Sequence, residues 1–167
     1  MRRLLTLLLP AVLIVAAGAS APVASAAGVR LRMLDGTDTS LADQVQGGRW
    51  TLVMMWTTYC GVCRRQYPVI SAFHDAHKDG DASVVGIALD GYDEIDTVRA
   101  YLAKKPFSFP SVMGEVAVVS GAFEAATGET FTGTPTYLLF SPERQLVAAK
   151  SGELTREALE KFMTKPR

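Results

Sequence analysis

The sequence has little of what marks several large classes of protein. Its 17 Lys and Arg are balanced by 17 Asp and Glu, so it lacks the basic excess that a nucleic-acid-binding surface needs. It has two cysteines, too few for a disulfide-stapled scaffold or an all-cysteine zinc site. Charged residues make up 20% and hydrophobic residues 49%, a composition that excludes a disordered chain. The 167 residues therefore predict one compact domain that is an enzyme, a binding module or a structural unit.

A long apolar run stands near the N-terminus. It extends from Leu4 to Ala17, follows the basic start Met1-Arg2-Arg3, and leads to the small-residue site Ala24-Ser25-Ala26. This order is typical of a secretory signal peptide. We therefore expect residues 1–26 to be removed and residues 27–167 to form an exported domain, in the periplasm or elsewhere outside the cytoplasm. The alternative is an uncleaved membrane anchor, although the run is shorter than the roughly 20 residues that cross a bilayer.

The rest of the chain alternates between predicted strands and helices. Continuous apolar runs predict strands buried on both faces, and apolar residues spaced by three or four predict helices. The predicted strands are 29–34, 50–57, 83–89, 136–140 and 145–149, and the predicted helices are 60–77, 93–103, 115–126 and 155–163. Residues 40–43 open one helical turn, and Pro106 and Pro110 mark a loop. This order indicates an α/β fold with a central mixed β-sheet flanked by helices.

The motif Cys60-Gly61-Val62-Cys63 follows a buried strand at the start of a predicted helix. A helix N-terminus leaves backbone N–H groups unpaired and carries partial positive charge, which stabilises a thiolate. The pKa of Cys60 is therefore expected to fall below the free value of about 8.5. This placement predicts thiol–disulfide exchange, with Cys60 as the attacking thiolate and Cys63 as the resolving thiol.

This cysteine pair has two other interpretations. A structural disulfide between residues three apart closes a very small loop and stabilises the fold little. A metal site would need His74 and His77 as well, but His74 lies about 16 Å along the helix from Cys63, too far for ligand distances near 2 Å. We therefore predict no metal site and expect the two histidines to lie at a solvated helix end.

A second motif, Gly133-Thr134-Pro135-Thr136, stands at the head of a predicted strand. Proline cannot donate a hydrogen bond to a sheet, so it belongs at the start of the strand. Nothing in the local sequence requires a cis peptide bond here.

Together these segments resemble the thioredoxin superfamily, and within it the TlpA/ResA-like exported thiol–disulfide oxidoreductases. The similarity extends over nearly all of the chain after residue 26. It is carried by the N-terminal segment Leu34-Asp35-Gly36 with Leu41, the active-site segment 56–64, Pro68 in the following helix, the insert 84–90 with 107–112, and the loop 133–136. The resemblance implies a thioredoxin-like fold with an N-terminal β extension and a central insert.

The resemblance also implies how a substrate binds. It implies a cis Thr134–Pro135 bond facing a Cys60–Cys63 disulfide, and pairing of the Thr134 backbone with an extended substrate segment. We expect the substrate to contact residues around the dithiol, namely Trp56, Tyr59, Gly61, Val62, Thr134 and Pro135. Trp56 has a second interpretation as a core residue, because buried tryptophan is common on central strands.

The chain departs from the family at two buried positions. Met54 stands where thioredoxins carry a buried aspartate, and Gln66 stands where the TlpA/ResA-like group often carries a glutamate. Neither residue titrates, so proton transfer to Cys63 must use water or another acid, for which Glu129 and Asp90 are the candidates. The Gly61-Val62 pair leaves the direction of electron flow open.

These observations predict an exported thiol–disulfide oxidoreductase that acts on protein substrates, as a reductant, without a cofactor. Its expected partners are protein thiols or disulfides and an upstream redox protein, and we expect a monomer. One alternative is a dedicated reductant in cytochrome c maturation or for another specific partner. A second is a non-catalytic binding module with a structural disulfide. Peroxide reduction is a third interpretation, which we disfavour.

Overall fold

The computed structural model describes residues 28–164. The predicted signal peptide, residues 1–26, lies outside the described residues. The strands are β1 (Arg30–Met33), β2 (Asp38–Ser40), β3 (Trp50–Trp56), β4 (Ala82–Ala88), β5 (Ser111–Met113), β6 (Thr136–Phe140) and β7 (Leu146–Ser151). The helices are α1 (Leu41–Gln44), α2 (Gly61–His77), the 3-10 turn η2 (Tyr92–Glu94), α3 (Ile95–Lys104), α4 (Val116–Thr127) and α5 (Arg156–Met163).

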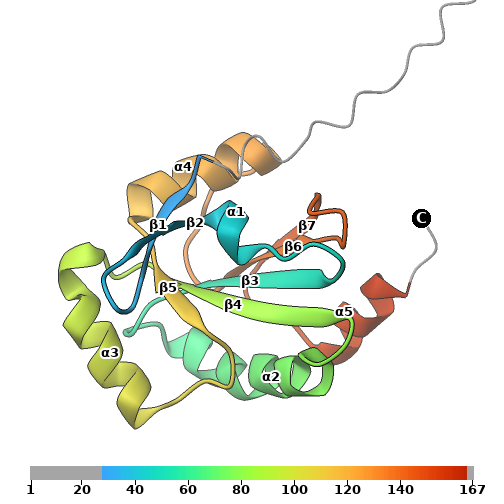
Figure 1. Cartoon of the computed structure of the whole chain (residues 1–167), viewed down its shortest axis with the longest axis horizontal. Coiled ribbons are helices and arrows are strands. Elements are labelled where there is room, and N and C mark those ends of the chain that lie inside the picture. The colour runs from blue at the N-terminus through green and yellow to red at the C-terminus, as the bar shows by residue number, and fades with distance from the viewer. Residues whose placement is uncertain (1–27, 165–167) are drawn as a thin grey trace, which may run out of the picture.

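One mixed sheet of seven strands organises these elements, in the order β2-β1-β5-β4-β3-β6-β7. β3 pairs in parallel with β4, and β4 with β5, while β6 runs antiparallel to β3. Helices cover both faces (Figure 1): α2, α3 and α5 lie on one side and α1 and α4 on the other. The predicted α/β fold with a central mixed sheet is confirmed.

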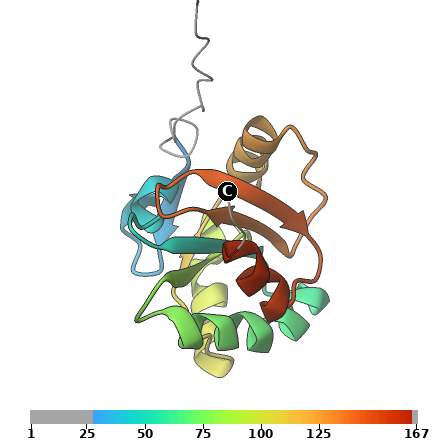
Figure 2. The same ribbon diagram turned by 90° about the vertical axis from the view of Figure 1, so that its right-hand side faces the viewer.

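β3 lies at the centre of the sheet because both of its faces are apolar. Leu52, Met54 and Trp56 contribute to the core under α2, whereas Val53 and Met55 contribute to the core under α4. Since successive strand residues point to opposite faces, the uninterrupted apolar run fills two cores at once. Figure 2 shows the sheet between its two helical layers.

Two short strands were not predicted from the sequence. β2 and β5 have three residues each, too few to show a periodic pattern. β2 pairs with β1 through Arg32 and Asp38, and β5 pairs with β1 through Met33 and Val112. The segment predicted as a loop around Pro110 therefore enters the sheet immediately after the proline, which is where proline is tolerated.

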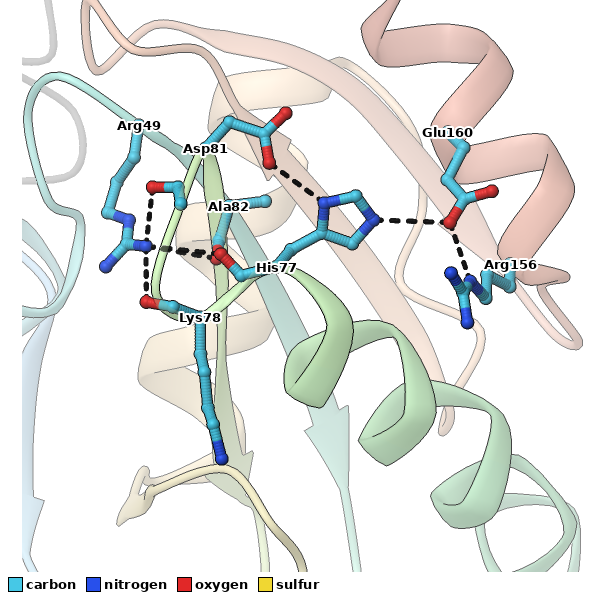
Figure 3. Close-up of polar contacts among 8 residues, drawn as sticks. Arg49, His77, Lys78, Asp81, Ala82, Arg156 and Glu160 are labelled. Carbon is cyan, nitrogen blue, oxygen red and sulfur yellow. Dashed lines mark hydrogen bonds and ion pairs between the residues drawn. The ribbon is translucent and has the colours of Figure 1, made fainter.

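The C-terminal end of α2 is tied to the sheet and to α5 (Figure 3). The Arg49 Nη2 atom donates hydrogen bonds to the carbonyl oxygens of Lys78 and Gly80, at 2.5 and 2.8 Å. His77 lies between Asp81 and the α5 residue Glu160, with N···O distances of 2.9 and 3.2 Å. The expectation of a solvated helix end is wrong for His74, which is buried and accepts a hydrogen bond from the Val84 amide.

Candidate active site around Cys60 and Cys63

The two cysteines form a disulfide at the N-terminal end of α2. The S–S distance is 2.13 Å and the Cα atoms lie 5.2 Å apart. Cys60 is the N-cap residue of the helix, and its sulfur accepts a hydrogen bond from the Cys63 amide at 3.0 Å. In the reduced protein the same amide and the partial positive charge of the helix end would stabilise a Cys60 thiolate. The geometry therefore suits a sulfur nucleophile at position 60.

The two sulfurs differ in their access to solvent. The Cys60 residue keeps 8% of its surface exposed, whereas Cys63 has none. A substrate sulfur can approach Cys60 from outside, but Cys63 can be reached only from within the protein. This difference in access is the one that the predicted roles of Cys60 as attacking thiol and Cys63 as resolving thiol require.

The loop before β6 lies directly against the disulfide. The Cys60 sulfur is 3.3 Å from the carbonyl oxygen of Thr134, although the two residues are 74 positions apart in the chain. The Thr134–Pro135 peptide bond is cis. The Pro135 carbonyl accepts a hydrogen bond from the Gly152 amide at 2.9 Å, which fixes the loop to the segment after β7. The two sequence motifs thus form one site.

The other predicted contact residues lie at different depths. Tyr59 is 75% exposed beside Cys60, Gly61 is exposed and Val62 is half-buried, so all three border the disulfide at the surface. Thr134 is half-buried, and Pro135 is buried beneath the loop. A substrate could therefore meet Tyr59, Gly61 and Val62 directly.

The prediction that Trp56 forms part of the contact surface is wrong. Trp56 is fully buried and belongs to the core under α2. Its ring packs against Tyr67 and Phe107, with centroids 5.7 and 4.9 Å away. Trp56 has the same strand parity as Leu52 and Met54, so its side chain points into the core below the site. The second interpretation, a core tryptophan, describes the structure.

The two positions where the family carries acids have structural roles here. Met54 is fully buried in the sheet. The side-chain oxygen of Gln66 accepts hydrogen bonds from the Tyr137 hydroxyl at 3.0 Å and from the Leu154 amide at 2.9 Å. Gln66 therefore joins α2 to β6 and to the loop before α5, and it supplies no proton.

Asp90 has a role that sequence reasoning missed. Its carboxylate accepts hydrogen bonds from the Thr58 amide at 3.1 Å and from the Thr58 hydroxyl at 2.5 Å. Thr58 lies two residues before Cys60, so Asp90 fixes the loop that carries Cys60. The sequence would have allowed this contact to be predicted, because Thr58 and Asp90 each follow a buried strand, and the carboxyl ends of the parallel strands β3 and β4 meet at one edge of the sheet. Glu129 makes no such contact and lies exposed after α4.

A cleft of about 430 Å³ opens between α3 and the loop that precedes Cys60. Its lining residues come from the active-site loop and from α3, and they are Thr58, Tyr59, Thr97, Ala100, Tyr101 and Lys104. Within residues 28–164, no three His, Cys, Asp or Glu side chains gather as a metal site would require. No helix in the same range has the length and apolar character needed to cross a membrane.

Comparison with known proteins identifies the family. The family model described as AhpC/TSA matches residues 17–149, which is most of the chain. The chain belongs to the AhpC/TSA family. This family lies within the thioredoxin superfamily, so the resemblance stated from the sequence is confirmed.

Members of the wider family give the activity class. The chain is 22% identical over 133 residues to the sporulation thiol-disulfide oxidoreductase A of Bacillus subtilis, covering 79% of this chain and 75% of the relative. It is 24% identical over 116 residues to the thiol-disulfide oxidoreductase ResA of Halalkalibacterium halodurans, covering 70% of this chain and 61% of the relative. These relatives support a thioredoxin-like thiol–disulfide oxidoreductase.

A solved structure agrees with this fold. The thioredoxin-related protein from Neisseria meningitidis serogroup B has a TM-score of 0.65 and 27% sequence identity. The superposition covers 80% of this chain and 95% of the other. The predicted thioredoxin-like architecture is confirmed.

One sequence feature bears on the peroxide-reduction interpretation. Thr57 stands three residues before Cys60, so the Thr-x-x-Cys spacing associated with peroxidatic cysteines is present in this chain. The Thr57 residue is only 4% exposed, and its hydroxyl has no hydrogen-bond partner among the described residues. It does not donate to the Cys60 sulfur here, and Cys60 is instead paired with Cys63.

Proposed function

We propose that residues 27–167 form an exported enzyme that reduces disulfides in protein substrates, after a signal peptide at residues 1–26 has been removed. One observation carries the proposal: the Cys60 sulfur caps α2 at 3.0 Å from the Cys63 amide and lies 3.3 Å from the Thr134 carbonyl. That position combines an activated sulfur with a backbone segment that a visiting chain can pair with.

The reaction follows from the two sulfur positions. In the reduced protein the Cys60 thiolate attacks one sulfur of a substrate disulfide, and the first substrate sulfur leaves as a thiolate. The Cys63 thiolate then attacks the Cys60 sulfur, the bond between Cys60 and the substrate breaks, and the second substrate sulfur leaves. The substrate gains two electrons and the protein ends with the Cys60–Cys63 disulfide. An upstream redox protein must return those two electrons.

Substrate contact is assigned to the surface around Cys60. Tyr59, Gly61 and Val62 border the sulfur at the surface, and the Thr134 backbone would pair with an extended substrate segment. Because main-chain hydrogen bonds carry little sequence information, we expect several unrelated protein disulfides to be accepted. A monomer is sufficient for this chemistry.

Turnover of a protein disulfide tests this proposal. The reduced protein should reduce the disulfides of insulin, and Cys60→Ser should abolish that activity because the attacking sulfur is gone. Cys63→Ser should remove turnover but keep the first step, which leaves a covalent adduct. A Cys60→Ser variant that still reduces insulin would contradict the assignment, and hydrogen peroxide as sole oxidant provides the control for peroxidase activity.

The redox midpoint of the Cys60–Cys63 pair separates the alternatives. A reductant should have a midpoint in the low range of thioredoxin-type reductants, about −270 mV. A structural disulfide should be more negative, below about −300 mV, with no thiolate absorbance at neutral pH. A partner-specific reductant, such as one serving cytochrome c maturation, should show a low midpoint but fail with insulin. Identifying the adducts of Cys63→Ser would then name its partner.

A further inference from the structure

The buried cysteine needs a route for its proton. Cys63 is fully buried, and burial raises the pKa of a thiol because it disfavours the charged form. The thiol must nevertheless lose its proton before it attacks Cys60. Met54 and Gln66 occupy the two positions where a buried acid would be expected, and neither titrates. Another path must connect Cys63 to solvent.

Tyr67 lies in the right place to begin such a path. It follows Cys63 by four residues on α2, so both side chains lie on one face of the helix. Helical side chains lean toward the N-terminus, which carries the Tyr67 ring over the turn that holds Cys63. The two residues belong to the same core cluster, and Tyr67 is only 7% exposed.

Tyr101 continues the path from α3. Its ring centroid is 6.3 Å from that of Tyr67. Within the described residues, the hydroxyls of both tyrosines are buried and neither has a hydrogen-bond partner of good geometry, although they lie close enough for Tyr101 to raise the pKa of Tyr67. A buried hydroxyl without a good hydrogen bond is unfavourable, so two neighbouring ones call for a ligand such as water. A water molecule between or beside them would satisfy both.

The surroundings of Tyr67 keep its hydroxyl neutral. Burial raises the pKa of Tyr67 most, interaction with the Tyr101 hydroxyl through a hydrogen bond and charge raises it next, the charge of Asp90 raises it further, and Arg64 opposes them. Asp90 is the residue that holds the active-site loop through Thr58. The Tyr67 hydroxyl therefore stays protonated, and it can pass a proton on without holding a negative charge.

Tyr101 also lines the open cleft beside the active-site loop, together with Thr58, Tyr59 and Lys104. Its hydroxyl is buried behind this lining, so a water molecule bound to that hydroxyl would link it to the cleft. We propose that the Tyr67 and Tyr101 hydroxyls carry the proton from Cys63 to water in this cleft. The inference rests on the proposed function, because it assigns the proton of that reaction's second step.

The step is balanced in protons and electrons. Cys63 gives its proton to the Tyr67 oxygen as Tyr67 passes its own proton to Tyr101, directly or through one water. Tyr101 passes a proton through the adjoining buried water to the cleft, and both tyrosines end neutral. The Cys63 thiolate attacks the Cys60 sulfur, and the substrate sulfur leaves with the bonding electron pair and takes a proton from solvent.

A two-phase reaction separates this step from the first one. Reduced protein mixed with excess 5,5′-dithiobis(2-nitrobenzoate) releases one coloured thiolate when Cys60 attacks and a second when Cys63 resolves the adduct. Tyr67→Phe should leave the first phase unchanged and slow the second about a hundredfold near neutral pH. The deficit should shrink as the pH rises, because hydroxide then removes the proton directly. Tyr101→Phe should show the same pattern.

The matched control is Tyr92→Phe. The Tyr92 hydroxyl donates to the Arg30 carbonyl at 3.1 Å, so the variant also loses one tyrosine hydroxyl, but away from Cys63. It should keep both phases. Second phases within twofold of the unsubstituted protein in both Tyr67→Phe and Tyr101→Phe, or a deficit that does not change with pH, would overturn the proposal.

Two further results keep the test decisive. If Tyr67→Phe does not fold, the second phase of the unsubstituted protein should still be slower in D₂O while the first is not, and equal slowing of both phases would overturn the path. An unsubstituted protein that shows no second phase would instead contradict the proposed function, since Cys63 would not resolve the adduct at all.

Discussion

At the scale of single residues, Gly86 shows how closely the core below the site is packed. A Cβ atom at this position would lie 2.4 Å from the Ser111 Oγ atom and 2.8 Å from the Trp56 Nε1 atom. The serine oxygen can rotate away, but the indole is held by Tyr67 and Phe107. β4 can pass this close to Trp56 only because residue 86 has no side chain.

We therefore predict that Gly86→Ala destabilises the protein. Overpacking of this kind costs about 1–3 kcal/mol in the free energy of unfolding, measured by urea denaturation. Gly121→Ala is the matched control, because nothing lies within 4 Å of its Cβ position in α4. That substitution should stabilise the helix by up to about 1 kcal/mol. Equal effects of the two substitutions would contradict this account of the packing.

At the scale of secondary-structure elements, Gln66 holds three segments together. Its side-chain oxygen binds the Tyr137 hydroxyl of β6 and the Leu154 amide before α5. The cis-proline loop precedes β6, so this buried contact also ties the active-site helix to the strand behind Pro135. Gln66 supplies a hydrogen-bond acceptor at this position but no titratable acid.

Removing the acceptor at position 66 should lower the stability of the protein more than replacing it with an ionisable acceptor. Gln66→Leu leaves a buried amide and a buried hydroxyl without a partner, and we expect a loss of about 2–4 kcal/mol in the free energy of unfolding. Gln66→Glu keeps two acceptor oxygens and should lose less stability near neutral pH. The prediction is contradicted if thermal or urea unfolding finds the leucine variant as stable as the glutamate variant.

The junction between α2 and α5 should respond to pH. Burial opposes the charge on His77, but hydrogen bonds to Asp81 and Glu160 outweigh it and raise the pKa of His77. Its bond to His77 lowers the pKa of Asp81, and bonds to Arg156 and then His77 lower that of Glu160. Protonated His77 therefore contributes its full stabilisation of the folded state below its unfolded pKa of about 6.5. That stabilisation is lost as the pH rises through the raised pKa of the folded state.

The carboxylates of Asp81 and Glu160 set the lower end of the pH range in which this junction stabilises the fold. Their stabilising contribution is present above their unfolded pKa values, about 4, and is lost as the pH falls through the lowered folded values. His77→Gln should therefore cost more stability at about pH 5.5 than at about pH 8.5. Burial lowers the pKa of His74, which acts in the opposite sense, but His74 is present in both proteins and cancels in the difference. A difference that is constant, or larger at the higher pH, would refute this assignment.

At the scale of the whole molecule, long apolar runs made the fold predictable. β3, β4 and β6 were predicted within a residue or two, because each is apolar on both faces. β2 and β5 were missed because three residues carry no period, and they form where neighbouring strands offer backbone partners: β1 for β2, and both β1 and β4 for β5. Local pattern therefore predicts the long strands, and tertiary pairing determines the short ones.

The site was predictable where it depended on one local motif. Cys60, Cys63 and the loop at Thr134–Pro135 each have a local signature, and the structure brings them together. The exposure of Trp56 was misjudged because its position just before the motif does not show whether the side chain is buried. Its burial follows only from the alternation of side chains along β3, which places Trp56 on the same face as Leu52. The link between Tyr67 and Tyr101 depends on how α3 packs against α2, which no single segment encodes.

The central claim is that Cys60 forms a covalent bond with a polypeptide while Cys63 waits inside the protein. The most direct measurement is the intact mass of reduced Cys63→Ser after incubation with a disulfide-containing protein, followed by peptide mapping. We predict one adduct per molecule, at Cys60, released by dithiothreitol and absent from the Cys60→Ser, Cys63→Ser double variant. A single variant that acquires no adduct under these conditions would contradict the account.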